Sequence, residues 1–245
     1  MRALRIILIL VVILGGLFVI VDRVAVHFAE GEAADKLRTT ENLDSTPDVN
    51  IKGFPFLTQV AGGSLDDVEV GIKDYQAATG TGGGTIRIDD LTADMKGVEF
   101  SGDYSSATAA TATGTATISY AELLKTAKSE PTAVAPGVEA RVVGLSDGGN
   151  GKIKVAVEVE VQALNIKKTV PVLSTVTVRN DKVRVHADNL PRIAGAALAE
   201  NRVREITDFQ QAIDQLPGGI VLDKVQAVEN GVEISVKGSD VKLAG

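Results

Sequence analysis

The chain has 245 residues, of which 44% are hydrophobic, so it can bury a core and does not have the composition of a disordered protein. Its formal net charge of −7 argues against nucleic acid as a partner, because phosphate binding needs a basic face. Cysteine is absent, which excludes disulfides, thiolate metal sites and a lipidated cysteine anchor.

The first segment, residues 1–22, predicts a transmembrane anchor or a signal. Two arginines precede an uncharged run from Ile6 to Val21, after which Asp22 and Arg23 return the chain to polar sequence. An anchor needs about 20 apolar residues, and the residues just before the run can extend it. A cleaved signal remains the alternative, although its nearest small-x-small site, Gly31-Glu32-Ala33, lies far downstream. Both interpretations place the remaining chain outside the cytoplasm, at the cell membrane or secreted.

Residues 23–47 predict a juxtamembrane helix followed by a polar linker. The apolar positions Val24, Phe28 and Leu37 are sparse, which is typical of a solvated stalk or a lightly docked helix.

From residue 48 to residue 245 the pattern predicts one β-rich domain. Apolar and polar residues alternate with the period of antiparallel strands that have one wet face. The expected strands are 49–51, 68–72, 86–95, 108–119, 137–145, 152–166, 170–178, 183–187, 220–228 and 232–236.

Two of these strands have special features. The apolar positions change from even to odd numbers at Asp89-Asp90, as a β-bulge in a long, curving strand would produce. The strand 108–119 has alanine and glycine on one face, so another part of the protein can approach its backbone closely.

Two helical segments interrupt the strands. Ser119 and Glu122 form a capping box that opens a helix from Tyr120 to about Lys128, and a second helical pattern runs from Pro191 to about Ile213. We expect an α+β fold in which a long curved antiparallel sheet wraps around helix and leaves an apolar channel. A sandwich of two sheets would have a similar sequence.

Catalytic patterns are missing. Neither His27 nor His186 has a neighbouring serine or acid pattern that suggests a triad, and no metal-binding motif occurs. Asp66-Asp67 and Asp89-Asp90 are poor acid/base pairs, because neighbouring strand residues point to opposite faces. Gly82-Gly83-Gly84 lacks the lysine and hydroxyl residue of a phosphate loop. We therefore expect neither an enzyme nor a cofactor.

One block carries a family resemblance. Val49-Asn50-Ile51-Lys52-Gly53-Phe54-Pro55-Phe56-Leu57-Thr58-Gln59, after an apolar helix and an alanine- and acid-rich helix, resembles the LmeA family of actinobacterial proteins. Weaker agreement comes from residues 63–70, 118–123 and 216–219. The resemblance implies a phospholipid-binding protein of the cell envelope, with a tubular lipid-binding architecture and no catalytic residues. The family's described role is in the maturation of envelope glycolipids, so the resemblance suggests support of that process, or lipid transfer, as the roles beyond binding.

The lipid-binding candidates come from this block and from the second helical segment. They are Gly53, Phe54, Pro55, Phe56, Leu57, Ile193, Leu198 and Phe209. In the block, aromatic side chains either fill the core at a strand end or line the mouth of a lipid channel. Arg192, Arg202 or Arg204 in the second segment, or Lys167-Lys168, would meet a headgroup phosphate. A structural or partner-binding envelope scaffold is the alternative function, and an enzyme acting on lipid is the third.

Overall fold

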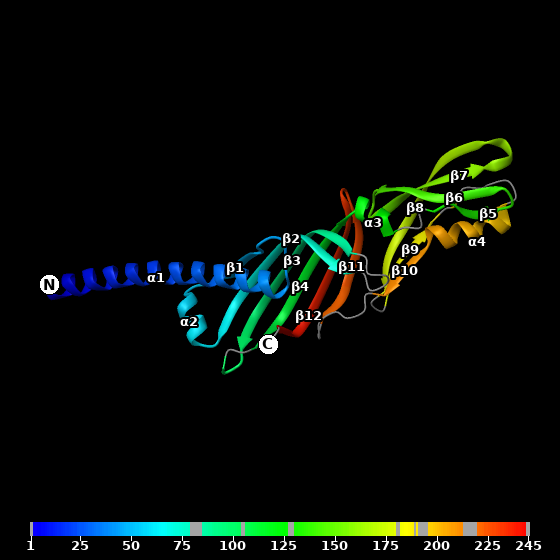
Figure 1. Ribbon diagram of the computed structural model, residues 1–245. Helices are drawn as coiled ribbons and strands as arrows, with labels where there is room; N and C mark the ends of the chain where they lie inside the picture. Colours follow the sequence, from blue (N-terminus) through cyan, green and yellow to red (C-terminus); the bar gives the residue numbers. More distant parts are fainter. Residues whose placement is uncertain are drawn as a thin grey trace.

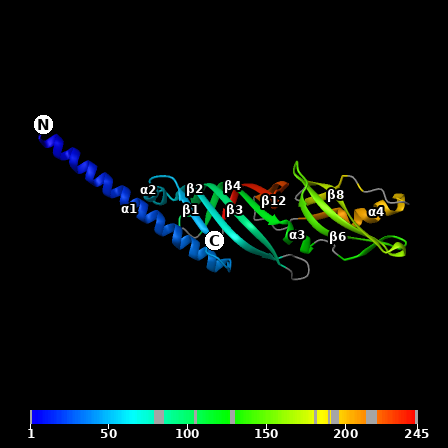
Figure 2. The same cartoon turned by 90° about the horizontal axis from the view of Figure 1, so that it is seen from above.

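The computed structural model describes residues 2–78, 85–103, 106–126, 130–179, 182–188, 190, 196–212 and 220–243. The expected fold class is confirmed: curled antiparallel sheets dominate, helices are few, and a long apolar helix forms the N-terminus. The molecule is elongated, with α1 (Arg2–Thr40) protruding from one end and two sheets following one another along its length (Figures 1 and 2).

Helix α1 is continuous from the apolar run into the domain. Its first part extends away from the sheets, and by length and composition it can cross a membrane. The second part of the helix lies beside sheet A (Figure 2).

Sheet A joins the two ends of the domain sequence, because strands near the C-terminus pair with strands near the N-terminus. Its spatial order is β1 (Asp48–Lys52), β2 (Ser64–Ala78), β3 (Thr85–Phe100), β4 (Ala107–Ser119), β12 (Gly231–Leu243) and β11 (Ile220–Val228). The small-residue strand is β4, in the middle of the sheet. A Cβ at Gly114 would lie 3.0 Å from Cγ2 of its cross-strand partner Val236, so glycine leaves room for that side chain.

The parity change at Asp89-Asp90 coincides with an irregularity between β2 and β3. Lys73 pairs with Asp90 and Tyr75 pairs with Ile88, so the register does not shift and the expected β-bulge is absent. Between these pairs Asp74 has a φ of 54°. Asparagine and aspartate tolerate this left-handed conformation better than most residues. The irregularity lets one face of a long, curling sheet stay apolar although the parity of the sequence changes.

Sheet B holds the middle of the sequence. Its spatial order is β10 (Phe209–Ala212), β9 (Lys182–Ala187), β8 (Ile166–Arg179), β7 (Lys152–Val161), β6 (Val138–Asp147) and β5 (Thr132–Ala135), with the 3-10 turn Gln162–Leu164 between β7 and β8. Alternation in β7 is clean: Ile153, Val155, Val157 and Val159 are all buried on one face.

The other helices are α2 (Phe56–Ala61), α3 (Tyr120–Thr126) and α4 (Ala196–Thr207). Helix α3 begins as predicted, since the Glu122 N–H donates to Ser119 Oγ at 3.4 Å. The prediction of helix up to Ile213 is wrong at its end, because Phe209–Ala212 is strand β10. Backbone pairing of Phe209 with Val185 in β9 overrides the helical pattern there.

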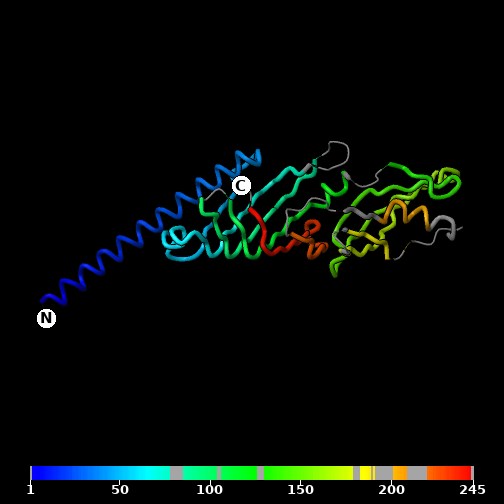
Figure 3. The backbone as a smooth tube through the Cα atoms, turned by 90° about the horizontal axis from the view of Figure 1, so that it is seen from below, coloured from blue at the N-terminus to red at the C-terminus, as the bar shows by residue number. Residues whose placement is uncertain are grey.

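Sheet B curls around α4. This helix contacts β5 at one edge of the sheet and β9 near the other (Figure 3). Its side chains Val203 and Ile206 are buried. The expected arrangement of a curved sheet around a helix is therefore present in sheet B. The strands as a whole are divided between two sheets, and β11 of sheet A contacts β8 and β7 of sheet B.

The described residues form two hydrophobic clusters. The larger one joins sheet B, α3 and α4 to the β11 side of sheet A, where the Tyr120 hydroxyl donates to the Val228 carbonyl at 2.9 Å. Burial raises the pKa of the Tyr120 phenol to about 12, so it stays a hydrogen-bond donor. The smaller cluster joins α1 and α2 to the opposite end of sheet A.

Candidate functional site

The Gly-Phe-Pro-Phe-Leu block forms the junction between α1, β1 and α2. Gly53 has a φ of 97°, and a Cβ there would lie 2.5 Å from Gln59 Nε2. Only glycine fits this position, because it tolerates the left-handed conformation and leaves space for Gln59. The Phe54-Pro55 peptide is cis. Phe56 begins α2 and is buried in the smaller cluster, against which Leu57 packs.

A buried carboxylate fixes α1 to this block. Asp22 is 0% exposed, and its Oδ1 accepts the Leu57 N–H at 2.8 Å. Its Oδ2 accepts a hydrogen bond from Arg23 at 2.6 Å, so the charge is paired as well as hydrogen-bonded. A buried charge is tolerated only with such partners. From the sequence alone, Asp22 was identified only as the first polar residue after the apolar run.

Arg23 links the same block to the surface. Its guanidinium carbon lies 5.3 Å from the centre of the Phe54 ring, within the range of a cation–π contact, and it donates to the Gly53 carbonyl at 3.4 Å. The Phe54 side chain is 56% exposed. Phe56 therefore fills the core, whereas Phe54 presents apolar surface outward.

The remaining contacts of α1 cover the edge of sheet A. Glu30 accepts the Ile51 N–H of edge strand β1 at 2.9 Å, which satisfies a donor that an open edge would leave unpaired. Val26 and Ala34 are buried on the same side of the helix. The helix docks through this face, whereas Val24 and Phe28, two of its sparse apolar positions, are exposed on the opposite face.

Sheet A carries a band of apolar residues that are only partly buried. Two neighbouring rows cross β2, β3, β4 and β12 on the apolar face, and each row ends on β11 at a buried residue, Leu222 or Val225. We name these rows the central band: Val70, Ala93, Gly114 and Val236, and Ile72, Leu91, Ala116 and Ile234.

The central band lies between the two packed clusters. Ile234 and Val236 pack against the larger cluster, whereas the other six members of the band belong to neither. The row next to the band on the α1 side holds Val68, Met95, Ala112 and Gly238, of which Val68 and Met95 pack against the smaller cluster. Beyond it, Leu65, Val98, Ala109 and Val241 form a row that is fully buried. The band is thus an apolar surface that the described part of the protein covers incompletely.

The opposite face of sheet A is polar. A shallow hollow of about 80 Å³ lies over it, which is the space of a few water molecules rather than of an acyl chain. Its lining residues are Glu69, Thr92, Ala93, Asp94, Thr113, Gly114 and Thr115.

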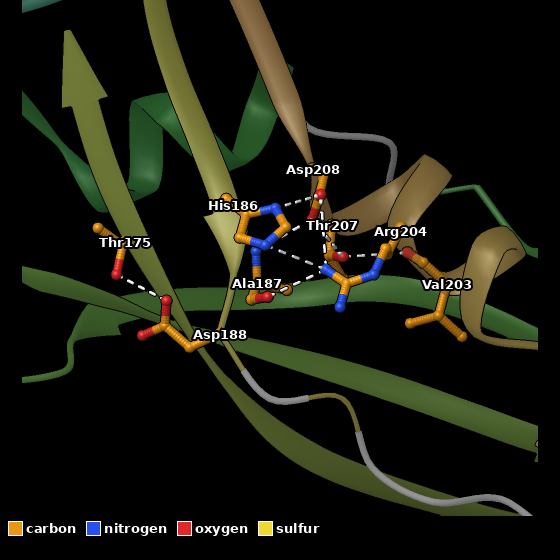
Figure 4. A network of polar contacts seen from close by, with 8 residues as sticks. All are labelled: Thr175, His186, Ala187, Asp188, Val203, Arg204, Thr207 and Asp208. Carbon is orange, nitrogen blue, oxygen red and sulfur yellow. Dashed lines mark hydrogen bonds and ion pairs between the residues drawn. The ribbon is translucent and has the colours of Figure 1, made fainter.

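A polar network fixes α4 to sheet B, and it includes a histidine–aspartate pair that the sequence did not reveal (Figure 4). His186 Nδ1 lies 2.7 Å from Asp208 Oδ2, although the two residues are 22 positions apart. Arg204 lies 3.4 Å from His186 Nε2 and donates to the Ala187 carbonyl at 3.1 Å. A cation therefore faces the ring nitrogen that a nucleophile would need, which favours a structural role.

Two lipid-binding candidates from the second helical segment, Leu198 and Phe209, belong to elements away from the Gly53–Leu57 block. Leu198 lies on α4 and Phe209 on β10, both in sheet B, and their side chains as well as Ile193 lie outside the described residues. Three of the basic candidates are engaged in ion pairs: Arg202 with Glu205 at 3.1 Å, Arg204 with Asp208 at 3.7 Å and Lys167 with Glu160 at 2.8 Å. Within the described ranges, no group of histidine and acidic residues has the arrangement of a metal site.

Comparison with known proteins gives one family. A family model described as LmeA-like phospholipid-binding matches residues 20–237. This range includes the docked part of α1, the Gly53–Leu57 block and both sheets. No curated protein and no solved structure matches the chain.

Proposed function

Because this chain belongs to the LmeA-like phospholipid-binding family, we propose that it binds a phospholipid with an acyl chain along the central band of sheet A. The protein would act without catalysis, at the cell membrane, with α1 as a single-pass anchor and residues 48–245 outside the cytoplasm. The observation that carries the proposal is the apolar, half-buried band between two packed clusters.

The chemistry of the band suits an alkyl chain. Its members carry only apolar groups, so a bound acyl chain would lose water without leaving a polar atom unpaired. Each buried methylene contributes about 0.8 kcal/mol. About ten methylenes along the band would therefore contribute about 8 kcal/mol, which corresponds to micromolar affinity, and the polar headgroup needs no enclosed pocket.

The Gly53–Leu57 block supports this function indirectly. It holds α1 against the end of sheet A, so the membrane anchor and the band belong to one rigid assembly.

Leu198, Phe209 and Ile193 belong to a second proposed location for the lipid, on the α4 side of sheet B. Transfer of lipid within the envelope, or support of glycolipid maturation, is the role that we propose for a carrier of this kind.

Mass spectrometry of lipid extracted from purified protein tests the proposal. Leu91→Asp places a charge in the central band, whereas Thr92→Asp places the same charge on the polar face one residue later. After extensive detergent washing, the wild type and Thr92→Asp should retain equal phospholipid, and Leu91→Asp should retain at least about tenfold less, which corresponds to 1.4 kcal/mol.

Equal retention by the two aspartate variants would rule out the band as the binding surface. Loss of lipid on substitution of Leu198 or Phe209, with Leu91→Asp unaffected, would place it at sheet B. A wild type that retains no phospholipid would favour the structural scaffold.

A further inference from the structure

The apolar surface of α1 continues beyond the end of the uncharged run. Val24 is 65% exposed and Phe28 is 73% exposed, and they extend a stripe that already includes Leu17 and Val21. These four residues recur at helical spacing, three or four positions apart, so they lie on one face of the helix. Asp22, Val26 and Ala34 occupy the opposite, docked face.

The uncharged run of α1 is by itself shorter than the hydrocarbon core of a bilayer. Ile6 to Val21 spans about 24 Å as a helix, whereas the hydrocarbon core of a bilayer is about 30 Å thick. Extending the apolar face to Phe28 brings its length to about 34 Å. The stripe therefore supplies the part of the span that the uncharged run lacks.

Asp22 and Arg23 do not prevent this deeper position. The Asp22 carboxylate is shielded by α2 and paired with Arg23, so it presents no unpaired charge to lipid. The Arg23 guanidinium lies over the Phe54 ring, from which a long side chain can reach the headgroup layer. Phe54 adds an exposed aromatic ring beside the helix, of the kind that collects at membrane interfaces.

We propose that the α1–α2 end of the domain enters the interfacial layer of the bilayer, where Val24, Phe28 and Phe54 contact lipid. These three residues are the membrane-side patch. The inference rests on the proposed membrane anchor and extends it: sheet A is next to the bilayer and sheet B is remote from it (Figure 1). A phospholipid would then reach the central band without crossing open water.

The chain contains no tryptophan, so a single introduced tryptophan is an unambiguous reporter of depth. The full chain carrying Phe28→Trp or Phe54→Trp is reconstituted in vesicles of phosphatidylcholine and phosphatidylglycerol, with lipids brominated at shallow or deep acyl positions. Leu14→Trp reports on the span itself. Leu164→Trp, at a residue that is 67% exposed at the far end of sheet B, is the aqueous control.

We expect blue-shifted emission and quenching by shallow bromines for Phe28→Trp and Phe54→Trp. Leu14→Trp should be quenched by deep bromines, and Leu164→Trp by neither. Circular dichroism that matches the wild type verifies folding of each variant.

Three outcomes would overturn the inference. If bromines quench Leu14→Trp but not Phe28→Trp or Phe54→Trp, α1 spans the membrane as proposed, but the membrane-side patch lies in water. If Leu14→Trp is also unquenched, the proposed anchor fails together with the patch. Blue-shifted emission of Phe28→Trp without quenching would mean that a protein partner covers the stripe instead of lipid.

Discussion

Sheet A and sheet B use the same alternation of apolar and polar residues, yet their apolar faces have different surroundings. In sheet B the branched side chains of β7 are buried in the same cluster as Val203 and Ile206 of α4, and this helix contacts strands near both edges. In sheet A the helix α1 lies at one end and sheet B at the other, and the central band between them is half-buried. A periodic strand pattern therefore specifies an apolar face, whereas the packing of helices decides whether that face becomes core or binding surface.

The choice of side chains agrees with this difference. Bulky valines fill the inner face of β7, whereas alanine and glycine are frequent on the inner face of β4, at Ala112, Gly114 and Ala116. Close packing of interiors needs volume, and a face of small residues cannot fill a core alone. Sheet B is thus a stability element, and sheet A holds the candidate binding face.

The largest effect should come from a charge in sheet B. Val157 is 1% exposed, so Val157→Asp would bury a carboxylate without a partner and should cost more than about 4 kcal/mol of unfolding free energy. Leu91→Asp in the central band should cost less than half as much, because water reaches its carboxylate. Urea denaturation followed by circular dichroism measures both, and equal costs would contradict the distinction between the sheets.

A milder pair sharpens the comparison without introducing charge. Val157→Ala removes two methyl groups from a packed cluster and should lower the unfolding free energy by about 2 kcal/mol. Val70→Ala removes the same groups from the half-buried band and should cost about 1 kcal/mol or less. Urea denaturation measures both losses of unfolding free energy. A larger loss for Val70→Ala than for Val157→Ala would show that the band is tightly packed.

The pH dependence of stability should be attributable in part to sheet B. Hydrogen bonds from Lys152 at 2.7 Å and Thr175 at 2.6 Å hold the pKa of Asp188 below its usual value of 3.8. Because the folded pKa is below the unfolded one, this stabilisation is complete above the unfolded pKa and is lost as pH falls through the folded pKa. Asp188→Asn should flatten the acid side of a plot of melting temperature against pH. An unchanged acid limb would mean that other carboxylates dominate.

The smallest effect is expected at the network that fixes α4. His186 is more than half exposed, so His186→Ala should cost only about 0.5 kcal/mol, but it should speed hydrogen exchange in α4. His27→Ala, at a histidine that is almost fully exposed on α1, is the matched control. Loss of lipid binding in His186→Ala alone would indicate that the network belongs to the functional site.

Much of the fold could be predicted from the sequence, because local periodicity determines strands and capping determines α3. The division into two sheets could not, since it depends on pairing between β4 and β12, which are more than 110 residues apart. The parity change in β3 was visible in the sequence, but the β-bulge inferred from it was wrong, because the register between β2 and β3 is the same on both sides of Asp89. Phe209 was assigned to helix because backbone pairing with β9 has no local signal.

The candidate site was predictable only where a motif is local. The Gly53–Leu57 block stood out as a sequence, but the partner that explains it, Asp22, is 35 residues before Leu57. One usable signal was present: Asp22, Val26 and Ala34 recur at helical spacing on a face that excludes Val24 and Phe28. For the half-buried state of the central band the sequence offered only the alanine and glycine residues of β4, because exposure depends on what packs above the sheet.

The most direct test of the account is to map where an acyl chain lies. The full chain is loaded with a phospholipid that carries a photoreactive diazirine in its acyl chain, irradiated, digested and analysed by mass spectrometry. Crosslinks should concentrate on central-band residues of β2, β3 and β4, such as Ile72, Leu91 and Ala116. Crosslinks confined to the interior of sheet B, or an absence of crosslinks from the central band, would contradict it.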